Sequence, residues 1–175
     1  MYCCGTLKGI TDECNVDIGG INSVYIACWD NVQKPVMSNG LITTIVGSAL
    51  GLSPIWKKYF FKNDTGNVVS TGQNQTNGMS SVTSVVSIQL QGITTDTANE
   101  INQLRKSNLA IIVEHSKGIY SYYGFYRPVK LTGDTMNTGT AFSDFEGFDL
   151  TFTENSIEYP YMLSTSAVNQ LVGGS

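Results

Sequence analysis

Residues 147–154 constrain the fold more than any other part of the chain, because apolar and polar side chains alternate along them. Side chains of a β-strand point to opposite faces in turn, so a period of two predicts one buried and one wet face. The predicted buried face carries Phe148, Leu150 and Phe152, and the predicted wet face carries Asp149, Thr151 and Thr153. Such a strand must be covered on one side by another layer, which predicts a mainly β fold.

Length and composition agree with this prediction. The chain has 175 residues, and we expect a single domain over residues 1–175. Only 14% of the residues are charged, compared with about 25% in typical soluble domains, and small polar residues take their place. This composition is typical of a β-rich chain with large contact surfaces. The net charge of −4 argues against a protein that grips nucleic acid by its phosphates, which requires a patch of Lys and Arg.

The sequence also bears on the compartment. It has no run of about 18 apolar residues that could span a membrane. Its first residues lack the basic-then-apolar order of a signal peptide. We therefore expect the protein to be cytosolic, at least during its synthesis.

Runs of β-branched and aromatic residues predict further strands, and one segment predicts a helix. The helix is expected at about residues 97–107, with Thr97 and Glu100 as a capping box and Arg105 and Lys106 at its C-terminal end. Strands are expected at residues 23–29, 41–46, 55–61, 82–90, 109–113 and 119–126, with residues 128–131 continuing toward a sheet edge. Irregular structure is expected at residues 1–20, a turn at 47–54, a loop at 133–139, and a tail or short helix at 164–175. Together, these strands and the helix predict an antiparallel β-sandwich or partial barrel with one flanking α-helix.

Residues 62–80 form the most polar stretch of the chain, with no helical period. A long polar segment within a compact domain is usually functional. We interpret it as a projecting arm or hairpin. Its polar residues include Asn63, Asp64, Asn67, Gln73, Asn74, Gln75 and Asn77.

The cysteines do not have the spacing of a metal site. Zinc ligands usually come in pairs two to four residues apart, whereas Cys3 and Cys4 are adjacent and Cys14 and Cys28 are isolated. We expect free cysteines, with metal binding or a disulfide as alternatives.

Candidate catalytic groups are few. His115 follows Glu114 at the end of a predicted strand, where neighbouring side chains point to opposite faces and cannot easily bond to each other. A hydrolase that uses these two residues is a third-ranked hypothesis. The acidic residues around Asp144-Phe145-Glu146-Gly147 contain a fragment of a calcium loop, but we expect them to form a solvated strand face or a negative inner surface. We expect no enzyme activity, no metal and no cofactor.

The aromatic run at residues 119–126 permits two interpretations. Aromatic side chains can stack on bases or sugars. Without basic residues between them, a core or subunit contact is the favoured interpretation. A β-sandwich that recognises carbohydrate or a host surface through this strand is the alternative function.

The order of these elements resembles a known family. A strand at residues 81–90, a short helix, a hairpin over residues 109–126, a Gly- and Thr-rich loop at 132–141 and the strand at 143–154 follow one another. This order, with Gly139-Thr140, Asp144, Gly147-Phe148 and Glu154 or Glu158, resembles structural tail proteins of phages that infect Bacteroidetes-type bacteria. Those proteins belong with the tail-tube fold, and the resemblance covers most of residues 7–160.

The resemblance implies a non-enzymatic virion protein. Tail-tube subunits usually form rings of six in which the inner strands join into one barrel that DNA passes through, and long polar arms reach the next ring. It implies a homo-oligomer, adjacent tail or connector proteins as partners, DNA as passing cargo only, no membrane, and assembly in the host cytoplasm. Residues 62–80 would be such an arm, with Asn63, Asp64, Asn67, Gln73, Asn74, Gln75 and Asn77 as the candidate contacts with another subunit. Asp149, Thr151 and Thr153 would then face either the lumen or solvent.

Overall fold

The computed structural model describes residues 19–173 except 46–55, 63, 77 and 142. The predicted turn at 47–54, most of the irregular segment at 1–20, and Cys3, Cys4, Cys14, Asn63 and Asn77 lie outside the described residues. The described part is mainly β, with two sheets and two helices, and no barrel closes within it. The predicted mainly β sandwich with a flanking helix is therefore confirmed.

One sheet has seven described strands in the order β2-β3-β11-β8-β7-β1-β4. Its strands are β1 (Ile21–Cys28), β2 (Val36–Ser38), β3 (Leu41–Thr44), β4 (Lys57–Phe60), β7 (Leu109–His115), β8 (Tyr120–Tyr123) and β11 (Tyr161–Leu163). The β3–β11 pair is parallel, and the other pairs are antiparallel.

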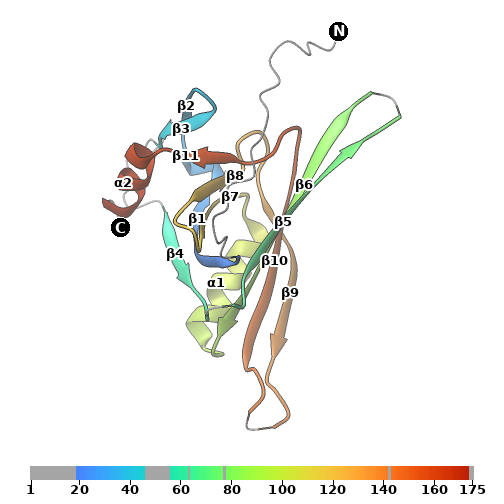
Figure 1. The fold of residues 1–175 in the computed structure, drawn as a ribbon. Coiled ribbons are helices and arrows are strands. Elements are labelled where there is room, and N and C mark those ends of the chain that lie inside the picture. Colours follow the sequence, from blue (N-terminus) through green and yellow to red (C-terminus); the bar gives the residue numbers. More distant parts are fainter. Residues whose placement is uncertain (1–18, 46–55, 63, 77, 142, 174–175) are drawn as a thin grey trace.

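The other sheet has four longer strands in the order β5-β6-β10-β9, all antiparallel. They are β5 (Asn67–Asn74), β6 (Ser80–Gln91), β10 (Gly147–Ser156) and β9 (Lys130–Asn137). Figure 1 shows the β5–β6 and β9–β10 hairpins extending well past the rest of the protein at opposite ends of this sheet.

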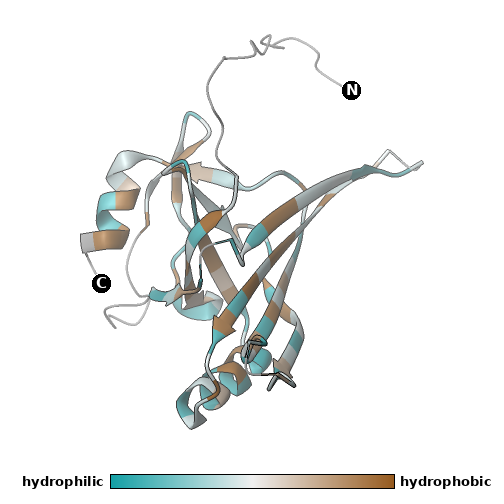
Figure 2. Ribbon diagram, turned by 60° about the horizontal axis from the view of Figure 1, so that its bottom comes forward, coloured by the Kyte–Doolittle hydropathy of each residue, from teal (hydrophilic) through white to brown (hydrophobic). Residues whose placement is uncertain are grey.

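A shared apolar core joins the two sheets. It contains Phe148, Leu150 and Phe152 of β10, which are 6%, 1% and 0% exposed, as the alternation predicts. Alternate residues of β6 join them, together with Val24 and Ile26 of β1 and Ile111 of β7. Burying a large apolar side chain stabilises a fold by about 1.5–3 kcal/mol, so this strip holds the sandwich together. Figure 2 shows that apolar residues concentrate on the strands of both sheets.

Two helices cover the sheets. α1 (Thr95–Lys106) buries Ile101 and Leu104 in the core between the sheets. α2 (Thr165–Gly173) packs Ala167 and Leu171 on the other face of the seven-stranded sheet, so residues 164–175, expected as a tail or a short helix, contain a helix. β7 is therefore buried on both faces, in agreement with its continuous apolar sequence.

Several predicted boundaries are wrong. The first strand ends at Cys28, and Trp29 opens a 3₁₀ turn, η1 (Trp29–Asn31). The helix begins at Thr95, because Thr94 is the N-cap and its hydroxyl accepts a 3.1 Å hydrogen bond from the Thr97 amide. Glu100 therefore does not close a capping box, and its carboxylate accepts a hydrogen bond from the Tyr59 hydroxyl instead.

Two segments predicted as loops contain strands. Residues 133–139, expected to be a loop, lie mostly in β9, whose polar sequence suits an exposed edge strand. Residues 62–80, expected to be an arm or hairpin, contain β5, and Val68 of β5 packs against the core. This segment is thus partly an edge strand of the sandwich and partly a projecting hairpin end.

Candidate functional site

The outer face of the four-stranded sheet, defined here as the face turned away from the seven-stranded sheet, carries small polar side chains. Directly opposed residues of paired strands share a face. Thr153 of β10 lies opposite Val85 of β6 and Lys130 of β9, and Thr151 lies opposite Ser87. The rest of this face follows from the same register: Asn67, Val69, Thr71, Gln73, Thr83, Gln89, Thr135, Asp149 and Asn155. The predicted wet residues Asp149, Thr151 and Thr153 are half-buried on this face.

The outer face is close to electrically neutral. The four strands contain only four charged residues. Asp134 lies 3.5 Å from Arg105 of α1, and Glu154 is buried, which leaves Lys130 and Asp149 on the outer face. Of the acidic residues in these strands, only Asp149 lies on the outer face, because Glu154 points into the protein and Asp134 lies beside Arg105 of α1.

The edge strand β5 lacks the devices that usually prevent an edge from pairing with another chain. Among the described strands β5 pairs only with β6, over eight residues in unbroken register. It contains no charged residue and no proline. By contrast, β2 is three residues long, β4 carries Lys57 and Lys58, and β9 carries two charges and a register shift. Short length, charge and bulges protect edges from further pairing, so β5 is the least protected edge of the described strands.

The predicted subunit contacts lie along this edge and its hairpin. Asp64 is exposed in the turn before β5, Asn67 begins the strand, and Gln73 and Asn74 end it. Gln75 is exposed in the hairpin turn, where its amide donates to the Met79 carbonyl. The structure therefore brings the described members of this set together on one edge of one sheet.

A second feature is the buried carboxylate of Glu154, at the inner face of β10. Glu154 is 4% exposed and accepts a 2.9 Å hydrogen bond from the Gly124 amide. Within the described residues no cation lies within 4 Å of it. Burial raises the pKa of Glu154 to about 7, although the Gly124 hydrogen bond works in the opposite direction. The sequence analysis named Glu154 only as a position of the family pattern and did not predict its burial, although Glu154 continues the phase of Phe148, Leu150 and Phe152.

Gly124 links Glu154 to an aromatic pocket. Its amide donates to Glu154 and its carbonyl accepts a 2.7 Å hydrogen bond from Trp29 Nε1. It has φ of +100°, and a Cβ at this position would lie 3.2 Å from the Ala110 Cα. Glycine is therefore required here for both conformation and space.

We expect Gly124→Ala to lower the free energy of unfolding by about 1–3 kcal/mol, since it adds backbone strain and a close contact. Urea unfolding monitored by fluorescence measures the change. Gly118→Ala is the matched control, because Gly118 has φ of +80° but nothing within 4 Å of an added Cβ. Equal destabilisation by the two substitutions would show that the close packing around Gly124 contributes nothing.

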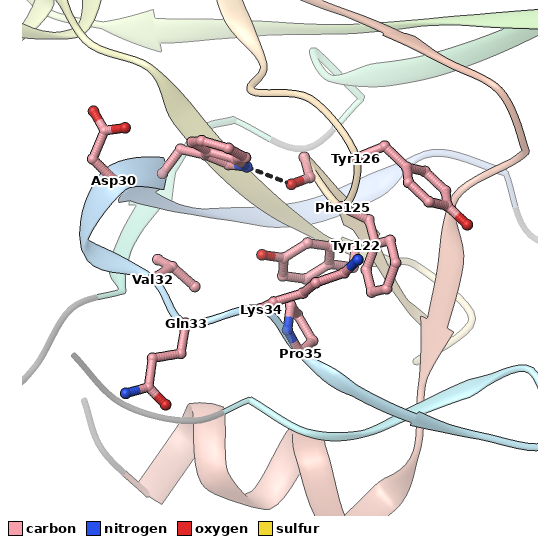
Figure 3. A pocket seen from close by; sticks show the side chains of 10 residues that line it. Asp30, Val32, Gln33, Lys34, Pro35, Tyr122, Phe125 and Tyr126 are labelled. Carbon is pink, nitrogen blue, oxygen red and sulfur yellow. Dashed lines mark hydrogen bonds between the residues drawn. The ribbon is translucent and has the colours of Figure 1, made fainter. Parts of the chain in front are cut away.

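The pocket beside Gly124 has a volume of about 450 Å³. Figure 3 shows how its side chains are arranged. Its walls come from the turn after β1, from β8 and from the segment after β8: Trp29, Asp30, Val32, Gln33, Lys34, Pro35, Tyr122, Gly124, Phe125 and Tyr126. Of the predicted aromatic strand, Tyr122 and Tyr123 are buried in β8, whereas Phe125 and Tyr126 lie beyond the strand and face this pocket.

The remaining candidate residues form separate contacts. Glu114 accepts from Ser23 and lies 3.6 Å from Lys58, whereas His115 Nε2 lies 2.7 Å from the Ser121 hydroxyl. The prediction that His115 and Glu114 do not bond to each other is confirmed. Burial lowers the pKa of His115. Ser121 is fully buried, so its hydroxyl is not exposed to a substrate.

The acidic residues do not converge. Asp144 accepts from the Thr140 and Ala141 amides, which lowers its pKa, and Glu158 accepts from the Tyr161 hydroxyl. In the described part of the chain no three His, Cys, Asp or Glu side chains could hold a metal together. Cys28 is half-buried with a free thiol.

Comparison with known proteins does not assign this chain to a family. The chain matches no known family model, no curated protein and no solved structure. None of the described helices is both long and apolar enough to cross a bilayer.

Proposed function

We propose that this protein is a ring-forming structural subunit of a phage tail or a related tube, in which the four-stranded sheet lines the channel. The observation that carries the proposal is the combination of an uncovered polar face with the unprotected edge strand β5. A soluble monomer normally blocks such an edge, whereas a subunit that pairs with its neighbour needs it open.

The strand directions are compatible with ring closure. All three pairs in the sheet are antiparallel, so the two edge strands β5 and β9 run in opposite directions. Pairing of β5 in one copy with β9 in the next therefore continues the antiparallel pattern. Such a contact joins two different surfaces, and a contact of this kind produces a ring when the rotation closes.

The outer face would then become the channel lining. Barrels of about 16–18 strands already enclose an aqueous channel, so about six copies that each contribute four strands would enclose a wider one. A lining with one Lys and one Asp per subunit offers no basic patch that would hold phosphates. DNA could pass such a surface without being retained.

The β5–β6 hairpin is the proposed contact between successive rings. Its end is polar and projects beyond the sandwich (Figure 1). The same proposal places the protein in the phage tail, next to other tail or connector proteins, and places its assembly in the host cytoplasm.

Sedimentation of the purified protein tests the proposed ring assembly. We expect a ring-sized species, and a monomer at every concentration would contradict the proposal.

Shortening the hairpin separates stacking from folding. We expect replacement of residues 75–79 by Asn-Gly to preserve the thermal transition within a few degrees, because a two-residue turn can connect the strands and the removed residues are exposed wherever the structure describes them. Rings should still form, but they should not stack into tubes, as seen by electron microscopy. Tubes of normal length from this variant would exclude the hairpin as the contact between rings.

A further inference from the structure

Hydrogen bonds hold one wall of the aromatic pocket beside Gly124. Trp29 is fixed by its indole hydrogen bond to the Gly124 carbonyl, and Gly124 is held in turn by the buried Glu154. Binding sites depend on side chains held in place by such supporting contacts.

The opposite wall is also supported. Phe125 makes edge-to-face contacts with Tyr126 and Tyr161, each with ring centroids 5.0 Å apart. The hydroxyls of Tyr126 and Tyr161 are 3.0 Å apart. The volume of about 450 Å³ falls in the range of about 300–1,000 Å³ that is typical of small-molecule sites.

The charge that faces the rings is positive. Lys34 Nζ lies 4.8 Å from the centroid of Phe125 and 5.7 Å from that of Tyr126. Within the described residues no carboxylate lies within 4 Å of this ammonium group. Figure 3 shows the Asp30 carboxylate turned away from the rings, while the Tyr122 hydroxyl points toward Val32.

We infer that this pocket binds a compact organic anion, specifically a carboxylate carried by an apolar ring. The carboxylate would pair with Lys34 in a charge-assisted hydrogen bond, and the ring would pack against Trp29 and Phe125. The same chemistry is offered by a free aromatic acid and by the C-terminal residue of a peptide. This site does not depend on the ring assembly proposed above, since none of its lining residues belongs to the four-stranded sheet.

NMR titration of the full chain tests this inference, because the protein has only two tryptophans. Benzoate should shift the indole N–H signal of Trp29 saturably, with Kd on the order of 1 mM for so small a ligand, and should shift that of Trp56 less. Benzyl alcohol, which lacks the charge, should bind at least tenfold more weakly, and acetate, which lacks the ring, should produce no saturable shift. If N-acetyl-phenylalanine binds more tightly than benzoate, the natural ligand is a peptide C-terminus. If benzoate binds more tightly, the natural ligand is a free aromatic acid.

Lys34→Met supplies the matched variant, because it keeps the packing of the side-chain stem and removes the charge. It should weaken benzoate binding at least tenfold, whereas Lys106→Met on α1 makes the same charge change outside the pocket and should leave binding unchanged. Equal binding of benzoate and benzyl alcohol, or unchanged binding in Lys34→Met, would overturn the inference. Binding of glucuronate without binding of benzoate would assign the pocket to sugars and would also overturn it.

Discussion

One of two neighbouring proline substitutions in β5, Ser70→Pro or Thr71→Pro, is expected to abolish ring assembly while the subunit stays folded. Successive residues of an antiparallel edge strand send their amides alternately to the partner strand and outward. Proline has no amide hydrogen, so one substitution removes a hydrogen bond to β6 and the other removes only an outward donor. The first should lower stability by about 1–3 kcal/mol, because it leaves a carbonyl of β6 without its donor, and the second should lower it much less.

Circular dichroism melting identifies the variant that stays folded, and light scattering then gives its mass. We expect this variant to be monomeric under conditions where the unmodified protein assembles. Lys57→Pro is the control, because proline is tolerated at the first residue of an edge strand and β4 takes no part in the proposed contact. Normal assembly of the folded β5 variant would mean that this edge is not where subunits join.

The second large effect concerns the buried carboxylate of Glu154. The unfolded chain releases this proton near pH 4.5, whereas the folded protein keeps it until about pH 7. Between these values the folded state binds more protons, so the free energy of unfolding must fall as the pH rises. The shift of pKa corresponds to roughly 3 kcal/mol of lost stability above pH 7.

Glu154→Gln should remove this loss, because a neutral amide oxygen can still accept the Gly124 hydrogen bond. We expect the variant to match the unmodified protein near pH 4.5 and to be more stable at pH 8 by up to about 3 kcal/mol. Urea unfolding at both pH values measures the difference. Glu146→Gln, at an exposed position, should leave the pH dependence unchanged. If Glu154→Gln were less stable than the parent at pH 8, the ionised carboxylate would have to be stabilising.

Sequence reasoning most readily found the strands with buried apolar side chains, which alternate with polar residues in β6 and β10 and run continuously in β7. Phe148, Leu150 and Phe152 of β10 are the clearest example. The same reasoning found only the start of β9 and took residues 133–139 for a loop, because the side chains of this edge strand are largely exposed on both faces. The start of α1 was misplaced because Thr94 and Thr97 are both acceptable caps, and only the observed hydrogen bond distinguishes them.

The candidate sites were harder to predict because they depend on contacts between distant segments. The aromatic pocket joins Trp29 and Lys34 to Phe125, which lie about 90 residues away, and nothing in either segment signals the other. Glu154 did carry a signal, since it lies in phase with the buried side of β10. Carboxylates are usually exposed, so a glutamate at a position that the alternation predicts to be buried is unusual. Such a disagreement between residue type and predicted burial indicates a special environment.

The most direct test of the central claim is electron cryomicroscopy of the purified protein over a range of concentrations. We predict closed rings in which β5 of each subunit pairs with β9 of its neighbour and Thr151 faces the channel. A particle that remains monomeric throughout, or a ring whose four-stranded sheets face outward, would contradict the proposed role.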